Sequence, residues 1–253
     1  AAMRFASLGS GSKGNATLVE AGGTLILVDC GFSARETARR LQRLGIEPAG
    51  IDAILVTHEH SDHASGVAAL SRKHEIPVYL SYGTARSGRC DGSARTECFN
   101  SGESFRIGAV DIQSVAVPHD AREPCQFRFS HRHYHLGLLT DLGSITRHIV
   151  QSYRGCDALL LEFNHDIAML MSGAYPPQLK RRVSSDWGHL NNRQAAGLLE
   201  ALGEDGPDRL VVAHISEQNN SRQCAETALE EISRIPGDVV WAGQGDGFDW
   251  CLL

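Results

Sequence analysis

The chain has 253 residues, of which 42% are hydrophobic, and its formal net charge is −6. This composition allows a large buried core, and we expect a single domain over residues 1–253. No apolar run reaches the roughly 18 residues that a transmembrane helix needs, so we expect no membrane partner. Because the chain is acidic overall, a polyanionic ligand must be held by local basic residues or by metal ions.

Cysteine usage and the first residues bear on the cellular compartment. Seven cysteines are present and none forms a CxxC pair. The odd count argues against a disulfide framework and against a cysteine zinc site. The N-terminal residues have no signal-peptide pattern, so we expect a cytoplasmic protein.

The first third of the chain predicts strands that alternate with helices. Strands are expected over residues 4–8, 16–20, 24–28, 51–56 and 77–80. The glycine-rich stretch 9–15 lacks the spacing of a phosphate-binding P-loop and predicts a tight hairpin. Ser33 can cap a helix that runs to about Leu44, with Glu36 as its capping-box partner, and a second helix is expected over residues 64–73.

The rest of the chain continues this pattern. We expect several strands within residues 104–118 and 125–139, and strands over 210–213 and 239–241 before a glycine-rich end. Helices are expected over residues 144–152, 193–202 and 223–234. The alternating histidines at 131, 133 and 135 favour a hairpin tip over a metal site. Runs of strands separated by helices predict an α/β fold, a four-layer αββα sandwich with two mixed sheets flanked by helices.

Residues 57–63 read Thr-His-Glu-His-Ser-Asp-His and directly follow an apolar run. His58 and His60 can face one ion from an extended loop, and Asp62 and His63 can face a second. Imidazole nitrogens and carboxylate oxygens suit zinc, manganese or iron. A solvated polar loop is the alternative. However, crowding neutral imidazoles beside an acid has little structural use without a metal, so we expect a metal site.

This stretch resembles the signature of the metallo-β-lactamase fold. Residues 117–120, 140–143 and 211–214 resemble the family's later motifs in the expected order. The resemblance implies two metal ions with seven ligands, which are His58, His60 and His119 for one ion, Asp62, His63 and His214 for the other, and Asp141 as the bridge. It also implies that Asp29 orients the metal ligands by contacting them without binding an ion itself. A purely structural turn at Asp29 is the alternative.

Further stretches resemble the phosphodiesterases of this fold. Residues 188–192 resemble a motif that implies contact of His189 with the scissile phosphate or protonation of the leaving group. Residues 161–166 resemble an acidic motif in which Glu162 supports that histidine, whereas His165 can face the site or simply pack. Two basic clusters could contact phosphates, and the second is more commonly a solvated helix face: Lys180, Arg181 and Arg182, and Arg35, Arg39, Arg40 and Arg43.

The whole set of motifs looks like the YycJ-like branch of the fold. This resemblance implies a dinuclear metal-dependent phosphodiesterase, a DNA nuclease that degrades double-stranded DNA from 5′ to 3′ with a metal-bridging hydroxide. Asp62, His189 and Glu162 would be catalytic, and the cofactors would be two divalent ions, zinc or manganese with iron possible. The alternatives are a small-molecule phosphodiesterase or thioester hydrolase of the same fold, and a non-catalytic metal-sensing or DNA-binding module.

Overall fold

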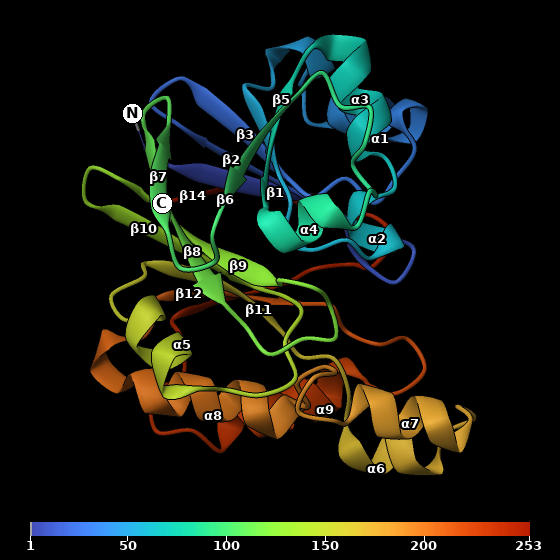
Figure 1. Cartoon of the computed structure of the whole chain (residues 1–253). Coiled ribbons are helices and arrows are strands. Elements are labelled where there is room, and N and C mark those ends of the chain that lie inside the picture. Colours follow the sequence, from blue (N-terminus) through green and yellow to red (C-terminus); the bar gives the residue numbers. More distant parts are fainter. Residues whose placement is uncertain (1) are drawn as a thin grey trace. The chain divides into compact units, whose positions relative to one another are not determined.

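Two seven-stranded mixed sheets run through the computed structural model, which describes residues 2–253 (Figure 1). The chain divides into two compact units. Unit 1 comprises residues 2–116, 121–134 and 243–253, and unit 2 comprises residues 117–120 and 135–242. The prediction of an α/β fold with two mixed sheets flanked by helices is confirmed. That the chain acts as one domain stays a prediction.

Unit 1 contains the whole first sheet, in the order β14-β1-β2-β3-β4-β5-β6. The four strands from β14 to β3 are antiparallel and those from β3 to β6 are parallel. The strands are β1 (Arg4–Gly11), β2 (Gly14–Ala21), β3 (Thr24–Val28), β4 (Ala53–Leu55), β5 (Pro77–Ser81), β6 (Arg95–Phe99) and β14 (Phe248–Leu252). The helices are α1 (Ala34–Arg43), η1 (Pro48–Gly50), α2 (Ser61–Ala64), α3 (Val67–His74) and α4 (Tyr82–Arg86).

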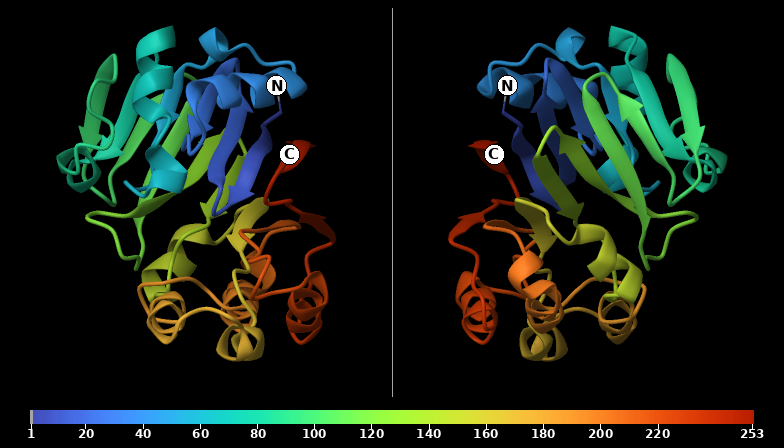
Figure 2. Two further views of the ribbon diagram at one scale, coloured as in Figure 1. Left: turned by 90° about the vertical axis from the view of Figure 1, so that its right-hand side faces the viewer. Right: turned by 90° about the vertical axis from the view of Figure 1, so that its left-hand side faces the viewer.

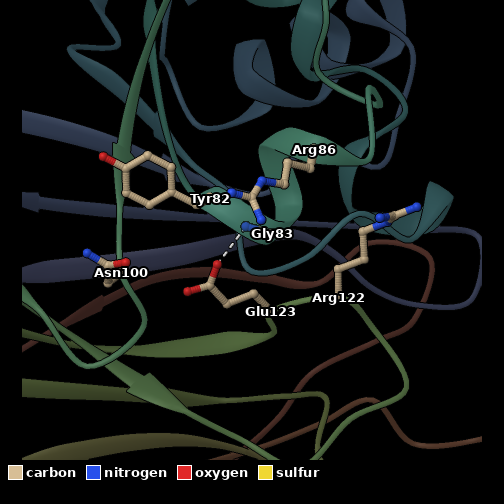
Figure 3. Close-up of a pocket in the computed structure, with 6 residues that line it drawn as sticks. All are labelled: Tyr82, Gly83, Arg86, Asn100, Arg122 and Glu123. Carbon is tan, nitrogen blue, oxygen red and sulfur yellow. Dashed lines mark hydrogen bonds between the residues drawn. The ribbon is translucent and has the colours of Figure 1, made fainter.

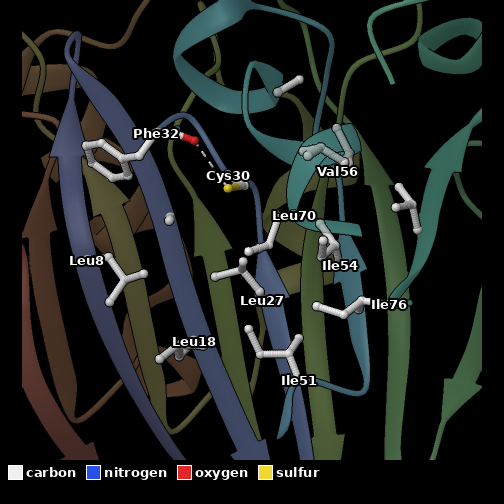
Figure 4. Packing of buried hydrophobic residues seen from close by; sticks show 14 of the residues in the cluster. Leu8, Leu18, Leu27, Cys30, Phe32, Ile51, Ile54, Val56, Leu70 and Ile76 are labelled. Carbon is white, nitrogen blue, oxygen red and sulfur yellow. Dashed lines mark hydrogen bonds between the residues drawn. The ribbon is translucent and has the colours of Figure 1, made fainter. Parts of the chain in front are cut away.

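Alternation along these strands builds the core of unit 1. Alternate residues of a strand point to opposite faces of a sheet. On one face, Leu18, Leu27 and Ile54 join the apolar side of the helices, including Leu41 of α1 and Leu70 of α3, in one buried cluster (Figure 4). Burial of such side chains stabilises each by about 1.5–3 kcal/mol relative to exposure, so this cluster holds the helices against the sheet.

The opposite face of the first sheet meets strands of the second sheet. Unit 1 supplies β7 (Ser104–Ile107), β8 (Val110–Ala116) and β9 (Cys125–His131) to that sheet as an antiparallel set. The ring of Tyr79 in β5 stacks on Phe105 of β7 at 5.7 Å between centroids. Phe99 of β6 lies 6.1 Å from Phe127 of β9. Aromatic side chains therefore join the two sheets within unit 1.

Both ends of the chain meet in the first sheet. β14 pairs antiparallel with β1, so the red C-terminal strand lies beside the blue N-terminal one in Figure 2. The indole Nε1 of Trp250 donates to the carbonyl of Leu44, and the guanidinium of Arg4 lies 4.1 Å from the centroid of the Trp250 ring. The sequence predicted only a glycine-rich end after residue 241, so this edge strand was not expected.

Unit 2 supplies the other four strands of the second sheet, and β10 to β13 run parallel to one another. They are β10 (Tyr134–Leu139), β11 (Ala158–Glu162), β12 (Arg209–Ala213) and β13 (Asp238–Trp241). The helices are α5 (Arg147–Tyr153), α6 (Ile167–Ser172), α7 (Pro177–Val183), α8 (Asn192–Leu202), η2 (Gly203–Asp205) and α9 (Arg222–Glu230). Parallel strands end at the same edge of a sheet, which gathers the residues that follow them.

The structure corrects two expectations about helices. The helix expected over residues 64–73 is two helices, α2 and α3, because the N–H of Gly66 donates to the carbonyl of Cys30 rather than continuing the helical pattern. Ser33 caps α1 as predicted by accepting from the N–H of Glu36. The Glu36 side chain, however, accepts from Arg39 and Arg40 and makes no return bond to the cap.

Two smaller differences concern the residues at which helices begin and end. α5 begins at Arg147, behind a Thr146 cap, rather than at residue 144. α9 ends at Glu230 rather than at residue 234.

Within the described part of the chain, every helix is too short or too polar to cross a lipid bilayer.

Candidate metal centre

The histidine loop, defined as residues 57–63, follows β4 in unit 1. Its imidazoles are crowded: the ring of His58 lies 4.5 Å from that of His60 and 4.3 Å from that of His63. His58 and His63 are each only 1% exposed. Protonation of neighbouring buried rings would place like charges side by side in a poorly solvated space. Neutral imidazoles in this arrangement are suited to a shared metal site.

One carboxylate fixes the orientation of two of these rings. Asp29 follows β3, and its Oδ2 accepts from Nδ1 of His63 at 2.7 Å and from the hydroxyl of Thr57 at 2.7 Å. Because that hydroxyl donates to Asp29, its oxygen accepts from Nδ1 of His58, 2.9 Å away. Both imidazoles therefore carry their proton on Nδ1 and present the Nε2 lone pair. Thr57 was not singled out from the sequence, where a threonine before a histidine carries no recognisable signal.

The backbone conformation of Asp29 and the pKa of its carboxyl are both consistent with a role in orienting the imidazoles. Its φ of 61° lies in the left-handed region, which costs free energy for a non-glycine residue and is found mostly where the surroundings impose it. Burial raises the pKa of the Asp29 carboxyl, while the hydrogen bonds from His63 and Thr57 act in the opposite direction. The interpretation of Asp29 as a support for the cluster is therefore preferred to a purely structural turn.

The glycine-rich hairpin between β1 and β2 reaches the same loop. Nδ2 of Asn15 donates to the backbone carbonyl of Asp62 at 3.2 Å and lies 3.1 Å from Nε2 of His63. Oδ2 of Asp62 lies 3.6 Å from that Nε2. The prediction of a tight hairpin is confirmed, and the hairpin lies against the histidine loop.

In unit 2, the predicted residues gather at the carboxyl edge of the parallel strands. Asp141 follows β10, Glu162 ends β11 and His214 follows β12. Oδ1 of Asp141 lies 3.6 Å from Nδ1 of His189 and 3.7 Å from Nδ1 of His214. His214 has a φ of 53°, the same unusual conformation as Asp29. The parallel register therefore brings together residues that lie more than 70 positions apart in the sequence.

Glu162 holds His189 in place. The carboxylate is fully buried, and its Oε1 accepts from the N–H groups of Leu142 at 3.0 Å and Leu190 at 3.1 Å. Its Oε2 accepts from Nδ1 of His189 at 2.9 Å. Both oxygens of Glu162 are thus used within the protein, and Nε2 of His189 is turned away from the carboxylate. This geometry matches the predicted support of His189 by Glu162.

The electrostatics of this pair favour a charged imidazole. Burial raises the pKa of Glu162 to about 7, although His189 opposes this shift. Burial by itself lowers the pKa of His189, but the charge and hydrogen bond of Glu162, with further contributions from Asp141 and Asp120, raise it to about 9. In the protein without bound ions, His189 therefore holds a proton at neutral pH and can donate it from Nε2.

His119 is held against the loop that precedes His189. Its Nδ1 donates to the carbonyl of Gly188 at 3.0 Å, which leaves the lone pair on Nε2. The same loop lies against Gly143, where a Cβ atom would come within 2.3 Å of the backbone of Asp186. Glycine is therefore required two residues after Asp141. The role of Gly188 as an acceptor was missed, since a backbone carbonyl leaves no trace in a residue pattern.

The donor set fits divalent ions. In unit 1, the structure brings together His58, His60, Asp62 and His63, and in unit 2 it brings together His119, Asp141, Glu162, His189 and His214. Each unit thus offers neutral imidazole nitrogens beside carboxylate oxygens, which are the ligands that zinc and manganese take in proteins. The assignment of these residues to two particular ions stays a prediction.

Most of the basic residues that the sequence offered for phosphate binding have other partners. Arg182 pairs with Asp120 at 2.6 Å, and Nζ of Lys180 donates to the carbonyl of Met171. On α1, the guanidiniums of Arg40 and Arg43 donate to backbone carbonyls of β1 and of residues 245–246. The interpretation of α1 as a solvated basic face is therefore wrong for these two arginines, which fasten the helix.

Two further histidines lie outside the candidate ligand set. His165 is buried, and burial lowers its pKa to about 4, which favours its neutral form. The hairpin tip predicted at residues 131–133 is confirmed, because β9 ends at His131 and β10 begins at Tyr134. Nδ1 of His131 donates to the carbonyl of Ala109 within unit 1.

Comparison with known proteins agrees with this geometry. The family model described as a beta-lactamase superfamily domain matches residues 24–215. Exodeoxyribonuclease YycJ of Bacillus anthracis is 33% identical over 251 residues, which cover 98% of this chain and 94% of that protein. Exodeoxyribonuclease WalJ of Streptococcus pneumoniae is 34% identical over 235 residues, which cover 90% of this chain and 87% of that protein.

A solved structure shares the fold at lower identity. The metallo-beta-lactamase fold protein YhfI from Bacillus subtilis superposes with a TM-score of 0.77 and 17% identity, and the match covers 100% of both chains. The matched family model, the two full-length relatives and this structure agree with one another. The chain belongs to the metallo-β-lactamase superfamily and is a homologue of the exodeoxyribonucleases YycJ and WalJ.

Proposed function

We propose that the protein is a dinuclear metal-dependent phosphodiesterase that degrades double-stranded DNA from the 5′ end. The observation that carries this proposal is the set of oriented imidazoles and carboxylates in a chain that is similar along 98% of its length to an exodeoxyribonuclease. DNA as substrate and a cytoplasmic location belong to the same proposal.

The proposal uses both units. His58, His60 and His119 would hold one ion, Asp62, His63 and His214 would hold the other, and Asp141 would be a ligand of both. The fixed Nδ1 protons of His58, His63 and His119 support this assignment, because each leaves Nε2 as the donor atom. Zinc or manganese suits the donors, and iron is possible. When bound, such a pair of ions activates a water molecule and stabilises negative charge on phosphoryl oxygens.

The chain's own residues perform the remaining steps. His189 contacts a nonbridging oxygen of the scissile phosphate or gives its Nε2 proton to the leaving oxygen. Glu162 keeps the His189 ring in this orientation through the 2.9 Å bond to Nδ1. A donor that is fixed before the reaction stabilises developing charge without the cost of reorienting in the transition state. Asp62, within the histidine loop, completes the catalytic set.

Two exposed side chains near His189 support a nucleic-acid substrate. Trp187 is 61% exposed, and it belongs to the loop that Gly143 and the Gly188 carbonyl fix in place. Exposed aromatic rings can stack on bases. Arg181 of α7 makes no side-chain hydrogen bond or ion pair within residues 2–253, unlike its neighbours in the basic cluster, so it can contact a phosphate.

Two labelled duplexes test the proposal. Metal-loaded protein is incubated with a 5′-phosphorylated duplex that carries its label at either the 5′ or the 3′ end, beside His60→Ala. We expect the 5′ label to leave at once as a mononucleotide and the 3′-labelled strand to shorten progressively. If no divalent metal yields nucleotides, the nuclease proposal is rejected. Activity confined to chromogenic phosphodiesters or thioesters would identify a small-molecule hydrolase instead.

A further inference from the structure

A surface pocket of about 610 Å³ lies in unit 1 outside the histidine loop (Figure 3). This volume is within the range of about 300–1,000 Å³ that small-molecule sites occupy. Three segments form its walls: helix α4, the turn after β6, and the loop before β9. The residues that line it are Tyr82, Gly83, Arg86, Asn100, Arg122 and Glu123.

The pocket is held together by Glu123. Its Oε2 accepts from the N–H of Gly83 at 2.6 Å, and its Oε1 accepts from the N–H of Ser101 at 3.0 Å. The backbone carbonyl of Glu123 accepts from the hydroxyl of Ser81, which also caps α4. A Cβ atom at Gly83 would lie 2.4 Å from Cβ of Glu123, so the contact requires glycine. The carboxylate in the pocket therefore has backbone donors on both oxygens and serves as a clamp between the three walls.

Two arginines in the pocket have no acidic partner. Arg86 and Arg122 are exposed, and among residues 2–253 no carboxylate lies within 4.0 Å of either guanidinium. Some other exposed arginines of unit 1 are paired, such as Arg39 with Glu36 and Arg106 with Asp111. In a chain of net charge −6, two unpaired guanidiniums in one pocket form a local anion-binding surface.

The pocket also has an aromatic wall. The ring of Tyr82 is 47% exposed and comes from the first position of α4, four residues before Arg86. An aromatic ring and two cations that line one pocket provide the two kinds of contact that a nucleotide needs, a surface for its base and donors for its phosphate. Nδ2 of Asn100 donates to Glu103 at 2.9 Å, and its Oδ1 can accept from a base edge or a sugar.

One hydrogen bond connects the pocket to the histidine loop. The backbone N–H of Arg122 donates to Oε1 of Glu59 at 2.9 Å. Glu59 lies between His58 and His60 in the sequence, and its side chain reaches the pocket loop. The pocket and the histidine loop are therefore fixed to each other within unit 1.

We propose that this pocket binds one nucleotide of the DNA strand beside the cleaved bond. The guanidiniums of Arg86 and Arg122 contact its phosphate groups, and the ring of Tyr82 packs against its base. This inference rests on the proposed function and extends it, because it assigns a strand-binding subsite that takes no part in bond cleavage. Binding through phosphate contacts is independent of base sequence and weakens as salt concentration rises.

Binding of DNA without catalysis tests the pocket directly. Wild type and the double variant Arg86→Gln/Arg122→Gln are titrated in EDTA against a fluorescent 5′-phosphorylated duplex over a series of salt concentrations. We expect the double variant to bind about tenfold more weakly at low salt, with a slope of log K against log salt that is shallower by roughly 1.8 for two lost phosphate contacts. Because Arg122→Gln keeps the backbone N–H, its bond to Glu59 remains.

Steady-state kinetics with the bound metal separate binding from chemistry. In the double variant, KM for DNA rises and kcat stays unchanged, while hydrolysis of bis(p-nitrophenyl) phosphate is unaffected. Tyr82→Ala raises KM for DNA in the same way. Arg147→Gln, which removes an exposed arginine of α5 outside both basic clusters, is the matched control and leaves affinity and slope at wild-type values.

Failure of the pocket and failure of the proposed function give different results. If wild type digests DNA and the double variant matches it in affinity, salt slope and KM, the pocket is not a DNA subsite. If wild type neither binds nor digests DNA, the proposed function is wrong and the subsite falls with it.

Discussion

The two groups of candidate metal ligands are built in different ways. In unit 1, four residues come from one stretch of seven, and a single carboxylate, Asp29, fixes His63 directly and His58 through Thr57. In unit 2, each residue comes from the end of a different strand or loop, and two of the imidazoles have separate supports. Glu162 holds His189, and the carbonyl of Gly188 holds His119.

This difference predicts how each group of candidate ligands responds to substitution of a supporting residue. A change at Asp29 disturbs two imidazoles at once, because both depend on the same carboxylate. A change at Glu162 disturbs one imidazole, because its other oxygen bonds only to backbone N–H groups. Unit 1 therefore behaves as one cooperative site, and unit 2 behaves as a set of separately held residues.

Removal of a ligand from the histidine loop has the largest expected effect. His60→Ala should lower kcat on duplex DNA by at least about 10³-fold, equal to about 4 kcal/mol of transition-state stabilisation. His60 is only partly buried and receives no bond from Asp29, so the fold should remain. Metal content and nucleotide release are measured together, with His133→Ala as the exposed-histidine control. Wild-type activity in His60→Ala would remove the loop from the catalytic centre.

Removal of the support for His189 should have the next largest effect. Glu162→Gln keeps an oxygen for Leu142 and Leu190 but loses the charge that faces Nδ1 of His189. We expect kcat to fall by about 10²-fold with metal content unchanged.

The same variant has a direct signature in the imidazole. The charge of Glu162 raises the pKa of His189 to about 9, so its removal should bring that pKa down toward the ordinary value of about 6.5. NMR titration of the metal-free protein measures it, with Glu200→Gln as the surface control. An unchanged His189 pKa would show that the pair does not act together.

Loss of the shared carboxylate tests the cooperative nature of unit 1. Asp29→Asn should weaken metal binding by about 10–100-fold, and Thr57→Val, which releases only His58, should weaken it less. Chelator competition measures the affinity. Asp52→Asn is the control, because Asp52 accepts from the N–H of Leu25 and touches no histidine. Equal losses in Asp29→Asn and Thr57→Val would mean that the two imidazoles are not fixed by one group.

Thiol reactivity gives the smallest effect and reports the packing around Asp29. Burial raises the pKa of Cys30 to about 11 and holds that of Cys125 well above its ordinary value, whereas Cys98 is exposed. Because the thiolate is the reactive form, iodoacetamide should modify Cys98 first at pH 7.5. Mass spectrometry follows each site. Rapid labelling of Cys30 in the folded wild type would contradict a closed network in unit 1.

Features formed by residues that lie close together in the sequence were predicted well. The histidine loop, the hairpin before Asn15 and the cap at Ser33 each lie within a few residues, so their physical cause can be read directly. The helix break at Gly66 could not be predicted, because its N–H bonds to Cys30 from a distant segment. The edge strand β14 was missed for the same reason, since it forms by pairing with β1 at the other end of the chain.

The candidate site also combines residues that the sequence could indicate with supporting groups that it could not. The resemblance to a known family indicated which residues matter, including His119, Asp141 and His214. Two supports that the sequence did not indicate are the backbone carbonyl of Gly188, which holds His119, and the hydroxyl of Thr57, which holds His58. Such groups occur in every protein, and only their position after folding gives them a role.

We propose that candidate ligands from both units bind the same pair of ions. Crystals of the metal-loaded protein, measured at the absorption edge of the bound ion, test it most directly. We predict two anomalous peaks about 3.5–4 Å apart, one among His58, His60 and His119 and the other among Asp62, His63 and His214. A single peak confined to Asp141, Glu162 and His189, or an empty histidine loop at saturating metal, would contradict it.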